Sequence, residues 1–328
     1  MLTGLYSMKP ERFDDVYGPQ ERASIEANLR IAHPVVPADR LTPEHLADVD
    51  VLVCSWGAPR LTAELLGAAP KLALVLYGAG SVRGVMTDEA YDRGVRITSA
   101  ASANAVPVAE FALSQILFAL KDGWHYVLAS RAAGRSELSR RERGAYGAVV
   151  GLWGLSSTGR LTAQLLAHHD VTVLASDPYA DPAVAEELGV RLVGLDELFA
   201  TSDVVSLHAP LLPSTRGTVD ARLLGSMKAG ATLVNTARGG LVDESALVAA
   251  LRAREDLFAV LDVTDPEPPV DGSPLFTLPN VVVTPHIAGS LGSERRRLGR
   301  LMAQELERYC AGEPLLHEVT RTALERTA

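Results

Sequence analysis

Three polar residues that could carry out acid–base and carboxylate chemistry each follow a β-rich apolar run. A guanidinium pairs bidentately with a carboxylate and stays charged, an imidazole exchanges protons near neutral pH, and a carboxylate can orient such an imidazole. Because parallel strands end at a common edge of their sheet, the three side chains are expected to converge there. They are Arg238 after residues 231–235, Glu267 after residues 258–263 and His286 after residues 281–283.

A glycine turn upstream of these residues is typical of dinucleotide binding. The turn reads Gly154-Leu155-Ser156-Ser157-Thr158-Gly159, between a strand-like run at 148–153 and a helical pattern at 160–168. Gly154 permits the tight turn, and Gly159 permits close packing of the helix on the strand. The amides of Ser156, Ser157 and Thr158 at the helix start are expected to face the pyrophosphate, helped by the helix dipole.

Two further features bear on the choice of dinucleotide. Asp177 ends the next strand-like run, 23 residues after Gly154 (177 minus 154). A carboxylate at this place accepts hydrogen bonds from the ribose hydroxyls of NAD and repels a 2′-phosphate, so NAD is predicted over NADP. Ser156 stands where the middle glycine is usual, and its side chain must either point away from the phosphate or donate its hydroxyl to it.

The order of elements predicts an α/β fold with two doubly wound parallel sheets. Residues 103–293 are expected to form a Rossmann NAD-binding domain, and residues 1–102 with 294–328 a smaller, flavodoxin-like substrate domain. A helix at 104–120 would connect the two, and the helix at 293–309 would pack back on the smaller domain. The apolar runs lie at 2–6, 51–54, 72–77, 95–98, 148–153, 171–175, 190–193, 204–207, 231–235, 258–263 and 281–283.

Composition limits the classes of function. The formal charge of −9 and the pI of about 5.4 disfavour a nucleic-acid or membrane surface, which would need a basic field. Cys54 and Cys310 are the two cysteines, far apart and outside any Cys/His cluster, so neither a disulfide framework nor a metal site is expected. A cytoplasmic protein is predicted, because the sequence shows neither a leader pattern nor a long apolar span.

Four motifs in order make the chain similar to the D-isomer-specific 2-hydroxyacid dehydrogenases. The resemblance covers about residues 72–310, and the motifs lie at 206–217, 235–243, 261–268 and 284–289. It implies that Arg238 binds the substrate carboxylate and polarises the 2-oxo group. It implies further that His286 protonates the nascent alkoxide during reduction, and that Glu267 fixes the tautomer of His286 and stabilises its imidazolium.

The resemblance also implies positions for the cofactor, the substrate and a second subunit. Asp262 would lie against the nicotinamide carboxamide, and the substrate loop would offer free backbone amides to the acid. Trp56 is expected to wall the pocket, and a homodimer through the cofactor domain is implied. The remaining cofactor positions are His208, Pro210, Thr215, Thr236 and Gly289, and the remaining substrate positions are Tyr77, Gly78, Ala79, Gly80 and Asn104.

Two alternatives stay open at this point. Arg83, in a loop that departs from the family pattern, either contacts a second anionic group of a phosphorylated or dicarboxylic acid or faces solvent. The leading function is an NAD-dependent reductase of a small 2-oxo acid such as glyoxylate, hydroxypyruvate or pyruvate. The alternative is an NAD(H)-sensing binding protein with little turnover, similar to the transcriptional corepressors of the family.

Overall fold

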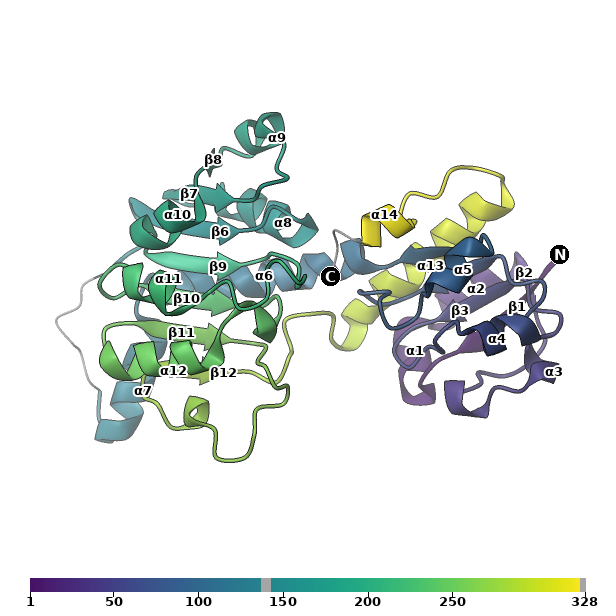
Figure 1. Ribbon diagram of the computed structural model, residues 1–328, viewed down its shortest axis with the longest axis horizontal. Helices are drawn as coiled ribbons and strands as arrows, with labels where there is room; N and C mark the ends of the chain where they lie inside the picture. Colours follow the sequence, from purple (N-terminus) through teal and green to yellow (C-terminus); the bar gives the residue numbers. More distant parts are fainter. Residues whose placement is uncertain (137–142, 325–328) are drawn as a thin grey trace. The chain divides into compact units, whose positions relative to one another are not determined.

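The computed structural model describes residues 1–136 and 143–324 and divides into two compact units (Figure 1). Unit 1 comprises residues 1–104 and 290–328, and unit 2 comprises residues 105–289. The chain crosses between them twice, and these crossings lie two and four residues from the domain boundaries expected from the sequence. Each unit is built around its own parallel sheet.

The sheet of unit 1 has five parallel strands in the order β2-β1-β3-β4-β5. This is the flavodoxin-like order, in which the chain runs from β1 outward to β2 and then returns to β3 on the other side of β1. Its strands are β1 (Leu2–Ser7), β2 (Leu29–Ile31), β3 (Val51–Cys54), β4 (Leu74–Tyr77) and β5 (Arg96–Ser99).

Helices cover this sheet, and the last long helix completes its core. Leu298, Met302 and Leu306 of α13 are buried against residues of β3 and β4, so the expected return of this helix to the first unit is confirmed. Two short helices, α1 (Phe13–Val16) and α2 (Pro19–Glu26), pack beside it. The other elements are η1 (Pro10–Arg12), η2 (Ala38–Arg40), α3 (Pro43–Leu46), α4 (Ala63–Ala68), α5 (Asp88–Asp92), η5 (Gly292–Arg295), α13 (Arg296–Cys310) and α14 (Arg321–Leu324).

The sheet of unit 2 has seven parallel strands in the order β12-β11-β10-β9-β6-β7-β8. The strand order reverses between β6 and β9, which is the doubly wound arrangement expected of a dinucleotide-binding domain. The predicted fold class is confirmed. The strands are β6 (Ala148–Trp153), β7 (Val171–Ser176), β8 (Arg191–Leu192), β9 (Val204–Leu207), β10 (Thr232–Asn235), β11 (Phe258–Leu261) and β12 (Val281–Val283).

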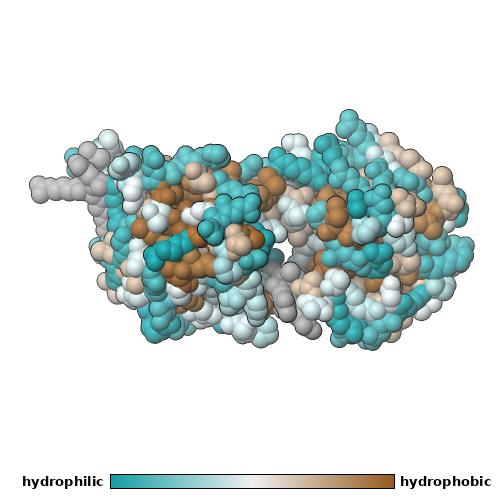
Figure 2. Space-filling model, turned by 90° about the horizontal axis from the view of Figure 1, so that it is seen from above, coloured by the Kyte–Doolittle hydropathy of each residue, from teal (hydrophilic) through white to brown (hydrophobic). Residues whose placement is uncertain are grey.

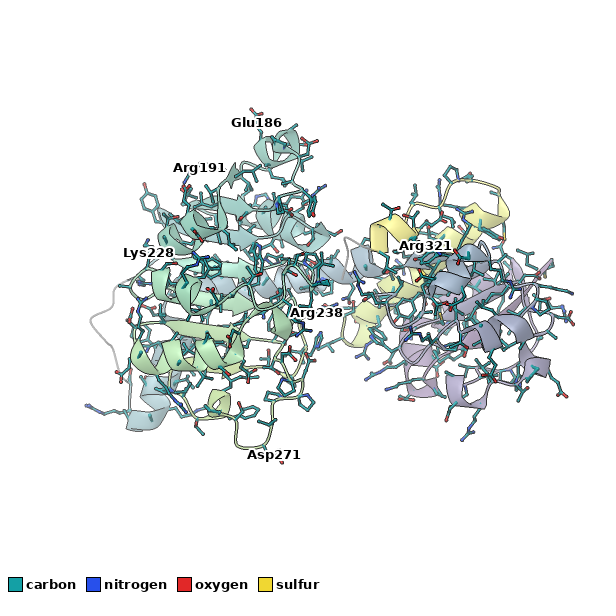
Figure 3. All side chains as sticks on the ribbon, in the orientation of Figure 1. Glu186, Arg191, Lys228, Arg238, Asp271 and Arg321 are labelled. Carbon is teal, nitrogen blue, oxygen red and sulfur yellow. The ribbon has the colours of Figure 1, made fainter. Side chains whose placement is uncertain are left out.

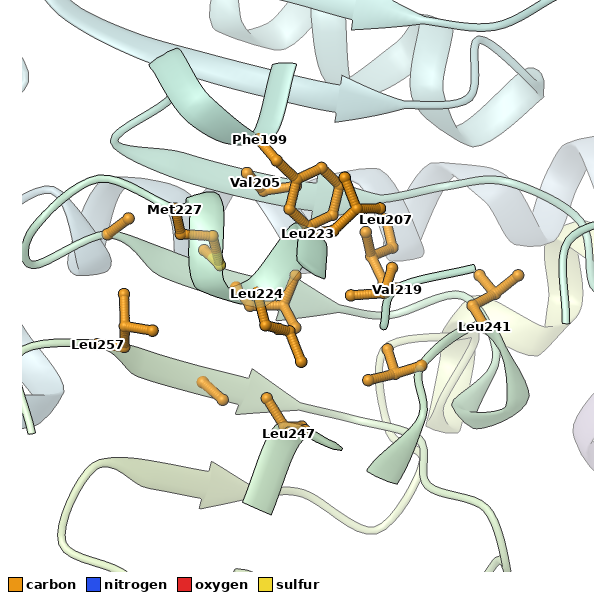
Figure 4. Packing of buried hydrophobic residues seen from close by; sticks show 14 of the residues in the cluster. Phe199, Val205, Leu207, Val219, Leu223, Leu224, Met227, Leu241, Leu247 and Leu257 are labelled. Carbon is orange, nitrogen blue, oxygen red and sulfur yellow. The ribbon is translucent and has the colours of Figure 1, made fainter. Parts of the chain in front are cut away.

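The central strands of unit 2 are apolar on both faces, as a sheet covered by helices requires. Figure 4 shows one of its two cores, in which Phe199, Val205 and Leu223 pack with the aliphatic side chains of neighbouring strands and helices. The other elements are α6 (Ala101–Ala119), α7 (Gly123–Ala133), α8 (Ser157–Leu166), α9 (Pro182–Glu187), α10 (Leu195–Thr201), α11 (Ala221–Ser226), η3 (Gly239–Leu241), α12 (Glu244–Ala253) and η4 (Pro274–Phe276).

On the face drawn in Figure 2, hydrophilic residues surround smaller hydrophobic patches in both units. Among the described residues no single helix has the length and apolar character needed to cross a membrane. Only α6 and α7 taken together, bent by 63° at the break between them, meet that test.

Candidate active site

Arg238 is positioned by the turn that follows β10. The buried side chain of Asn235 shapes this turn: its amide nitrogen donates to the carbonyl of Arg238 at 2.9 Å, and its oxygen accepts from the amide of Ala237 at 3.0 Å. Figure 3 places Arg238 at the end of the sheet to which the strand arrows point. Burial lowers the pKa of the Arg238 guanidinium, whereas the nearby carboxylate of Glu267 raises it.

Glu267 and His286 form a pair, as the sequence predicts. The Nδ1 atom of His286 lies 2.5 Å from Oε1 of Glu267, while the two side chains are 49% and 42% exposed. With Nδ1 engaged by a carboxylate, Nε2 is the ring nitrogen left to exchange a proton with a substrate. The carboxylate of Glu267 also raises the pKa of Arg238, so these two side chains lie within range of each other's charge.

The backbone at His286 has an uncommon conformation. Its φ of +54° lies in the left-handed region, which is rare for residues other than glycine. The amide of His286 donates to the carbonyls of Asp262 and Thr284, both at 3.0 Å. These hydrogen bonds hold His286 in a conformation that the residue would not adopt freely. Such conformations are common at functional sites.

Asp262 organises the loop that carries His286. Its carboxylate is 1% exposed and accepts the amides of Ile287 and Ala288, both at 2.8 Å, and the hydroxyl of Thr284 at 2.6 Å. The sequence interpretation gave Asp262 a place beside the nicotinamide but did not assign it this supporting part. Thr284 opens the fourth motif but was given no role, because the sequence does not indicate that its hydroxyl bonds a carboxylate at the end of another strand.

The glycine turn leaves no room for side chains at its two glycines. A Cβ atom on Gly154, whose φ is +103°, would lie 2.7 Å from the amide nitrogen of Ala209. A Cβ atom on Gly159 would collide with the carbonyl oxygen of Gly154. The turn thus brings β6, the start of α8 and the segment after β9 into close contact, with Ser157 and Thr158 in the first turn of α8.

The side chain of Ser156 is turned toward the segment after β9. Its φ of −63° and ψ of −179° are open to any residue, and its hydroxyl donates to the carbonyl of His208 at 3.0 Å. Of the two orientations considered from the sequence, this one turns the side chain back onto the fold. The hydroxyl therefore ties the glycine turn to the segment after β9.

Asp177 lies at the end of β7 beside the turn. Its Oδ2 accepts the amide of Leu155, and its Oδ1 accepts the amide of Tyr179, both at 2.8 Å. Each carboxylate oxygen can accept more than one hydrogen bond. The side chain therefore holds the turn and keeps acceptor capacity for ribose hydroxyls.

The side chain of His208 is not available to a cofactor. It is 5% exposed, and its Nε2 lies 3.0 Å from the hydroxyl of Ser206. Burial lowers the pKa of His208 to about 4, so the imidazole is neutral at physiological pH. The part of His208 next to the glycine turn is its carbonyl, which accepts the hydroxyl of Ser156. The position of this residue along the cofactor stays a prediction, and it would be its main chain that lies there.

The remaining predicted cofactor residues lie at strand ends or in loops of unit 2. The hydroxyl of Thr215 donates to the carbonyl of Pro210 at 2.6 Å and so shapes the loop after β9. Thr236, directly after β10, is 7% exposed, and its hydroxyl has no hydrogen-bond partner among the residues that the structure describes. Such an orphaned polar atom, together with the glycine turn and Asp177, fits a bound dinucleotide. Gly289 is the last residue of unit 2.

Most residues of the predicted substrate loop after β4 are buried, and most of its backbone amides are already hydrogen-bonded. Tyr77 is 8% exposed and packs in the core of unit 1, and Gly78 and Ala79 are buried too. The expectation of free amides is wrong for Gly78 and Ala79, which donate to the carbonyls of Cys54 and Tyr77, both at 2.8 Å. Within the described residues, the amide of Gly80 has no acceptor and stays available to a ligand.

Asn104 and Trp56 have defined partners inside unit 1. The side-chain oxygen of Asn104 accepts the amide of Ser290 at 2.9 Å, so it joins the two places where the chain crosses between units. Trp56 is half-buried, and the guanidinium of Arg295 lies 5.8 Å from its ring centroid. Arg83 donates to the carbonyl of Leu324 at 2.5 Å, so it is engaged by the C-terminal segment rather than facing solvent alone.

An ion pair near Glu267 was not foreseen. Arg216 and Asp265 are joined at 2.7 Å, and both lie beside Gly240. Asp265 precedes Pro266, and Glu267 precedes Pro268; both peptide bonds are cis. The pair links the loop after β9 to the segment that carries Glu267.

Comparison with known proteins places this geometry in a family. Residues 115–288 match the NAD-binding domain of the D-isomer specific 2-hydroxyacid dehydrogenases. The chain belongs to this family. A hydroxypyruvate reductase of Thermotoga maritima is 31% identical over 277 residues, which are 81% of this chain and 89% of that protein.

Two other members show how far the similarity extends. A D-3-phosphoglycerate dehydrogenase of Mycobacterium tuberculosis is 39% identical over 260 residues, which are 78% of this chain and 48% of that protein. The chain thus spans about half the length of this relative. The structure of a D-isomer specific 2-hydroxyacid dehydrogenase from Xanthobacter autotrophicus Py2, in complex with NADPH and MES, has a TM-score of 0.77 and 28% identity, and the match covers 97% of this chain and 98% of that one.

Proposed function

We propose that the protein is an NAD-dependent D-2-hydroxyacid dehydrogenase that works mainly as a reductase of a small 2-oxo acid. The observation that carries this proposal is the His286–Glu267 pair, with its 2.5 Å contact, next to a partly buried Arg238. A cation for the substrate carboxylate and a carboxylate-oriented imidazole are the two groups that reduction of a 2-oxo acid needs from a protein.

Each of the three residues has a separate task in this proposal. Arg238 binds the substrate carboxylate and polarises the 2-oxo group, which is favoured by its partial burial because less water competes. His286 donates its Nε2 proton to the oxygen that becomes the 2-hydroxyl. Glu267 holds Nδ1 and stabilises the charged ring before the proton leaves.

The dinucleotide would be held by the glycine turn, by Asp177 and by Thr236. When bound, its nicotinamide supplies the hydride for reduction and accepts it in oxidation. The protein contributes the orientation of the cofactor and the proton. Asp177 supports a preference for NAD, because its carboxylate would lie close to a 2′-phosphate.

The substrate is a small 2-oxo or 2-hydroxy acid in this proposal. The named activities of two relatives make hydroxypyruvate and phosphohydroxypyruvate the first compounds to test, beside glyoxylate and pyruvate. The amide of Gly80 and the side chain of Trp56 are proposed to contribute to substrate binding from unit 1. We place the activity in the cytoplasm, where NAD(H) is recycled, and cell fractionation with an antibody tests that placement.

A homodimer through unit 2 is also proposed. Phe118 of α6 and Val127 of α7 are each 38% exposed, and neighbouring apolar residues of these helices are only half-buried. Covering such side chains with a second copy would remove apolar surface from water. Light scattering coupled to size-exclusion chromatography should give twice the monomer mass, and Phe118→Glu should lower it.

The function is tested by following NADH oxidation with a panel of 2-oxo acids. The parent protein should turn over at least one of them, and His286→Gln should reduce kcat on the order of 10²- to 10⁴-fold while NADH still binds. Tight NADH binding with no turnover on any acid would contradict the proposal and favour an NAD(H)-sensing protein. An unchanged rate in His286→Gln would show that another group supplies the proton.

A further inference from the structure

A cavity of about 500 Å³ opens in unit 1, among the segments that follow its first three strands. Met8, Lys9 and Pro10 come directly after β1, Pro37–Arg40 follow β2, and Gly57 comes shortly after β3. The volume suits a small metabolite. Neither the predicted substrate loop after β4 nor any residue of the glycine turn lines this cavity.

The position of the cavity in the sheet is where α/β folds bind ligands. The order β2-β1-β3-β4-β5 reverses direction between β1 and β3. In open parallel sheets, connections leave such a switch point toward opposite faces, and a crevice forms outside the carboxyl ends of the two strands. The segments after β1 and β3 both line the cavity, and they are joined there because the amide of Lys9 donates to the carbonyl of Trp56 at 2.9 Å.

The lining carries unpaired positive charge. Neither Lys9 nor Arg40 makes a side-chain hydrogen bond or an ion pair with any other described residue, although most arginines of the chain that the structure describes do. Asp39 also lines the cavity, so its three charged groups carry a net charge of +1 (two cations minus one anion). In a chain of net charge −9, this is a local exception that favours an anion.

The wall beside Lys9 depends on a glycine. Gly57 has a φ of +81°, and a Cβ atom there would lie 2.5 Å from Cγ of Lys9. Any other residue would therefore displace the lysine stem from its place in the wall. Pro10 and Pro37 add two positions with fixed φ, so the lining is held in shape before a ligand arrives.

We propose that this cavity is a second ligand site, which binds a small hydroxylated molecule that bears a phosphate or carboxylate group. Lys9 and Arg40 bind the anionic group, and the carboxylate of Asp39 accepts a hydroxyl of the same molecule. The proposal does not depend on the chemistry proposed for Arg238, Glu267 and His286, none of which lines this cavity.

Binding is measured by isothermal titration calorimetry with three probes: inorganic phosphate, glycerol 3-phosphate and 3-hydroxypropionate. Arg238→Ala serves as the parent, so that anions cannot report the proposed active site. Glycerol 3-phosphate or 3-hydroxypropionate should bind with a Kd of about 1 mM or tighter. The first result identifies a phosphate ligand and the second a carboxylate ligand, and inorganic phosphate should bind more weakly because it lacks the hydroxyls.

Lys9→Ala and Arg40→Ala should each raise that Kd about fivefold or more, whereas Lys71→Ala, an exposed lysine of unit 1 outside the cavity, should leave it unchanged. Asp39→Ala should reduce the advantage of glycerol 3-phosphate over inorganic phosphate. Circular dichroism confirms that each variant is folded. Absence of binding for all three probes, or binding that neither cation affects, would overturn the proposal.

Discussion

The carbonyl of Asp262 accepts the amide of His286 at 3.0 Å, while the carboxylate of the same aspartate holds the amides of the next two residues. His286, which we propose transfers the proton, is therefore fixed by the end of the neighbouring strand β11. This arrangement explains how a residue with a φ of +54° is kept in place.

Asp262→Asn should misplace His286, because an amide group would direct one N–H toward the main-chain amides that the carboxylate now accepts. We expect a loss of stability of about 2 kcal/mol and a fall in kcat of about 100-fold. Denaturant unfolding and steady-state kinetics measure the two effects. Thr284→Val removes only the 2.6 Å hydroxyl bond and is the matched control, with a smaller effect on both.

Arg238→Lys should impair substrate binding as well as the rate. Lysine keeps the charge but lacks the planar fork that pairs bidentately with a carboxylate, so KM should rise and kcat should fall together, with kcat/KM reduced about 100-fold or more. The assay is NADH oxidation over a range of substrate concentrations. A variant with unchanged KM would show that the substrate carboxylate lies elsewhere.

Asp177 should set the preference for NADH. We expect the parent to use NADH on the order of 100-fold more efficiently than NADPH, because the carboxylate would be close to a 2′-phosphate. Asp177→Ala should reduce this ratio, chiefly by lowering the efficiency with NADH. The comparison of NADH with NADPH is informative because a relative from X. autotrophicus was solved in complex with NADPH. Equal efficiencies in the parent would count against the assignment.

Ser156→Gly should hardly change cofactor binding, since the hydroxyl bonds the His208 carbonyl and not the phosphate position. The Kd for NADH should stay within about threefold of the parent value, while the stability should drop by about 1 kcal/mol. Fluorescence titration and thermal unfolding separate the two. A tenfold weaker Kd in both Ser156→Gly and Ser156→Ala would instead mean that the hydroxyl binds phosphate.

His208 should make the stability fall in mild acid. In the unfolded chain a histidine gains its proton below about pH 6.5, whereas burial holds the pKa of His208 in the folded protein at about 4. Between these values the unfolded state binds more protons, so the free energy of unfolding decreases as the pH falls. The contribution at pH 5 is about 2 kcal/mol. Urea unfolding at pH 7.5 and pH 5 should show a smaller difference for His208→Gln.

The sequence was sufficient for the sheets wherever strands are continuously apolar. The runs at 51–54, 204–207 and 281–283 coincide with β3, β9 and β12. Strand β2 was missed, because it has three residues with a charged arginine in the middle and offers no periodic signal. The expected helix at 293–309 begins later, at Arg296, because a 3-10 turn precedes α13, and it ends one residue later, at Cys310.

The residues that carry the proposed chemistry could be predicted from the sequence, but the hydrogen bonds that hold them in place could not. The order of Arg238, Glu267 and His286 along strand ends was enough to expect their convergence. The bonds of Asp262, Asn235 and Ser156 join residues whose spacing in the sequence carries no pattern, so only coordinates reveal them. The hydrogen-bonded amides of the substrate loop could not be predicted either, because whether an N–H group is free depends on the chain segments that lie beside it.

The split of unit 1 between the two ends of the chain bears on how the protein is made. On the ribosome, residues 1–104 emerge without α13, which later supplies Leu298, Met302 and Leu306 to their core. The continuous unit 2 can finish folding first. Until α13 is made, part of the apolar face of the amino-terminal sheet stays uncovered. Nascent chains that stall before residue 296 are thus the species most in need of chaperones.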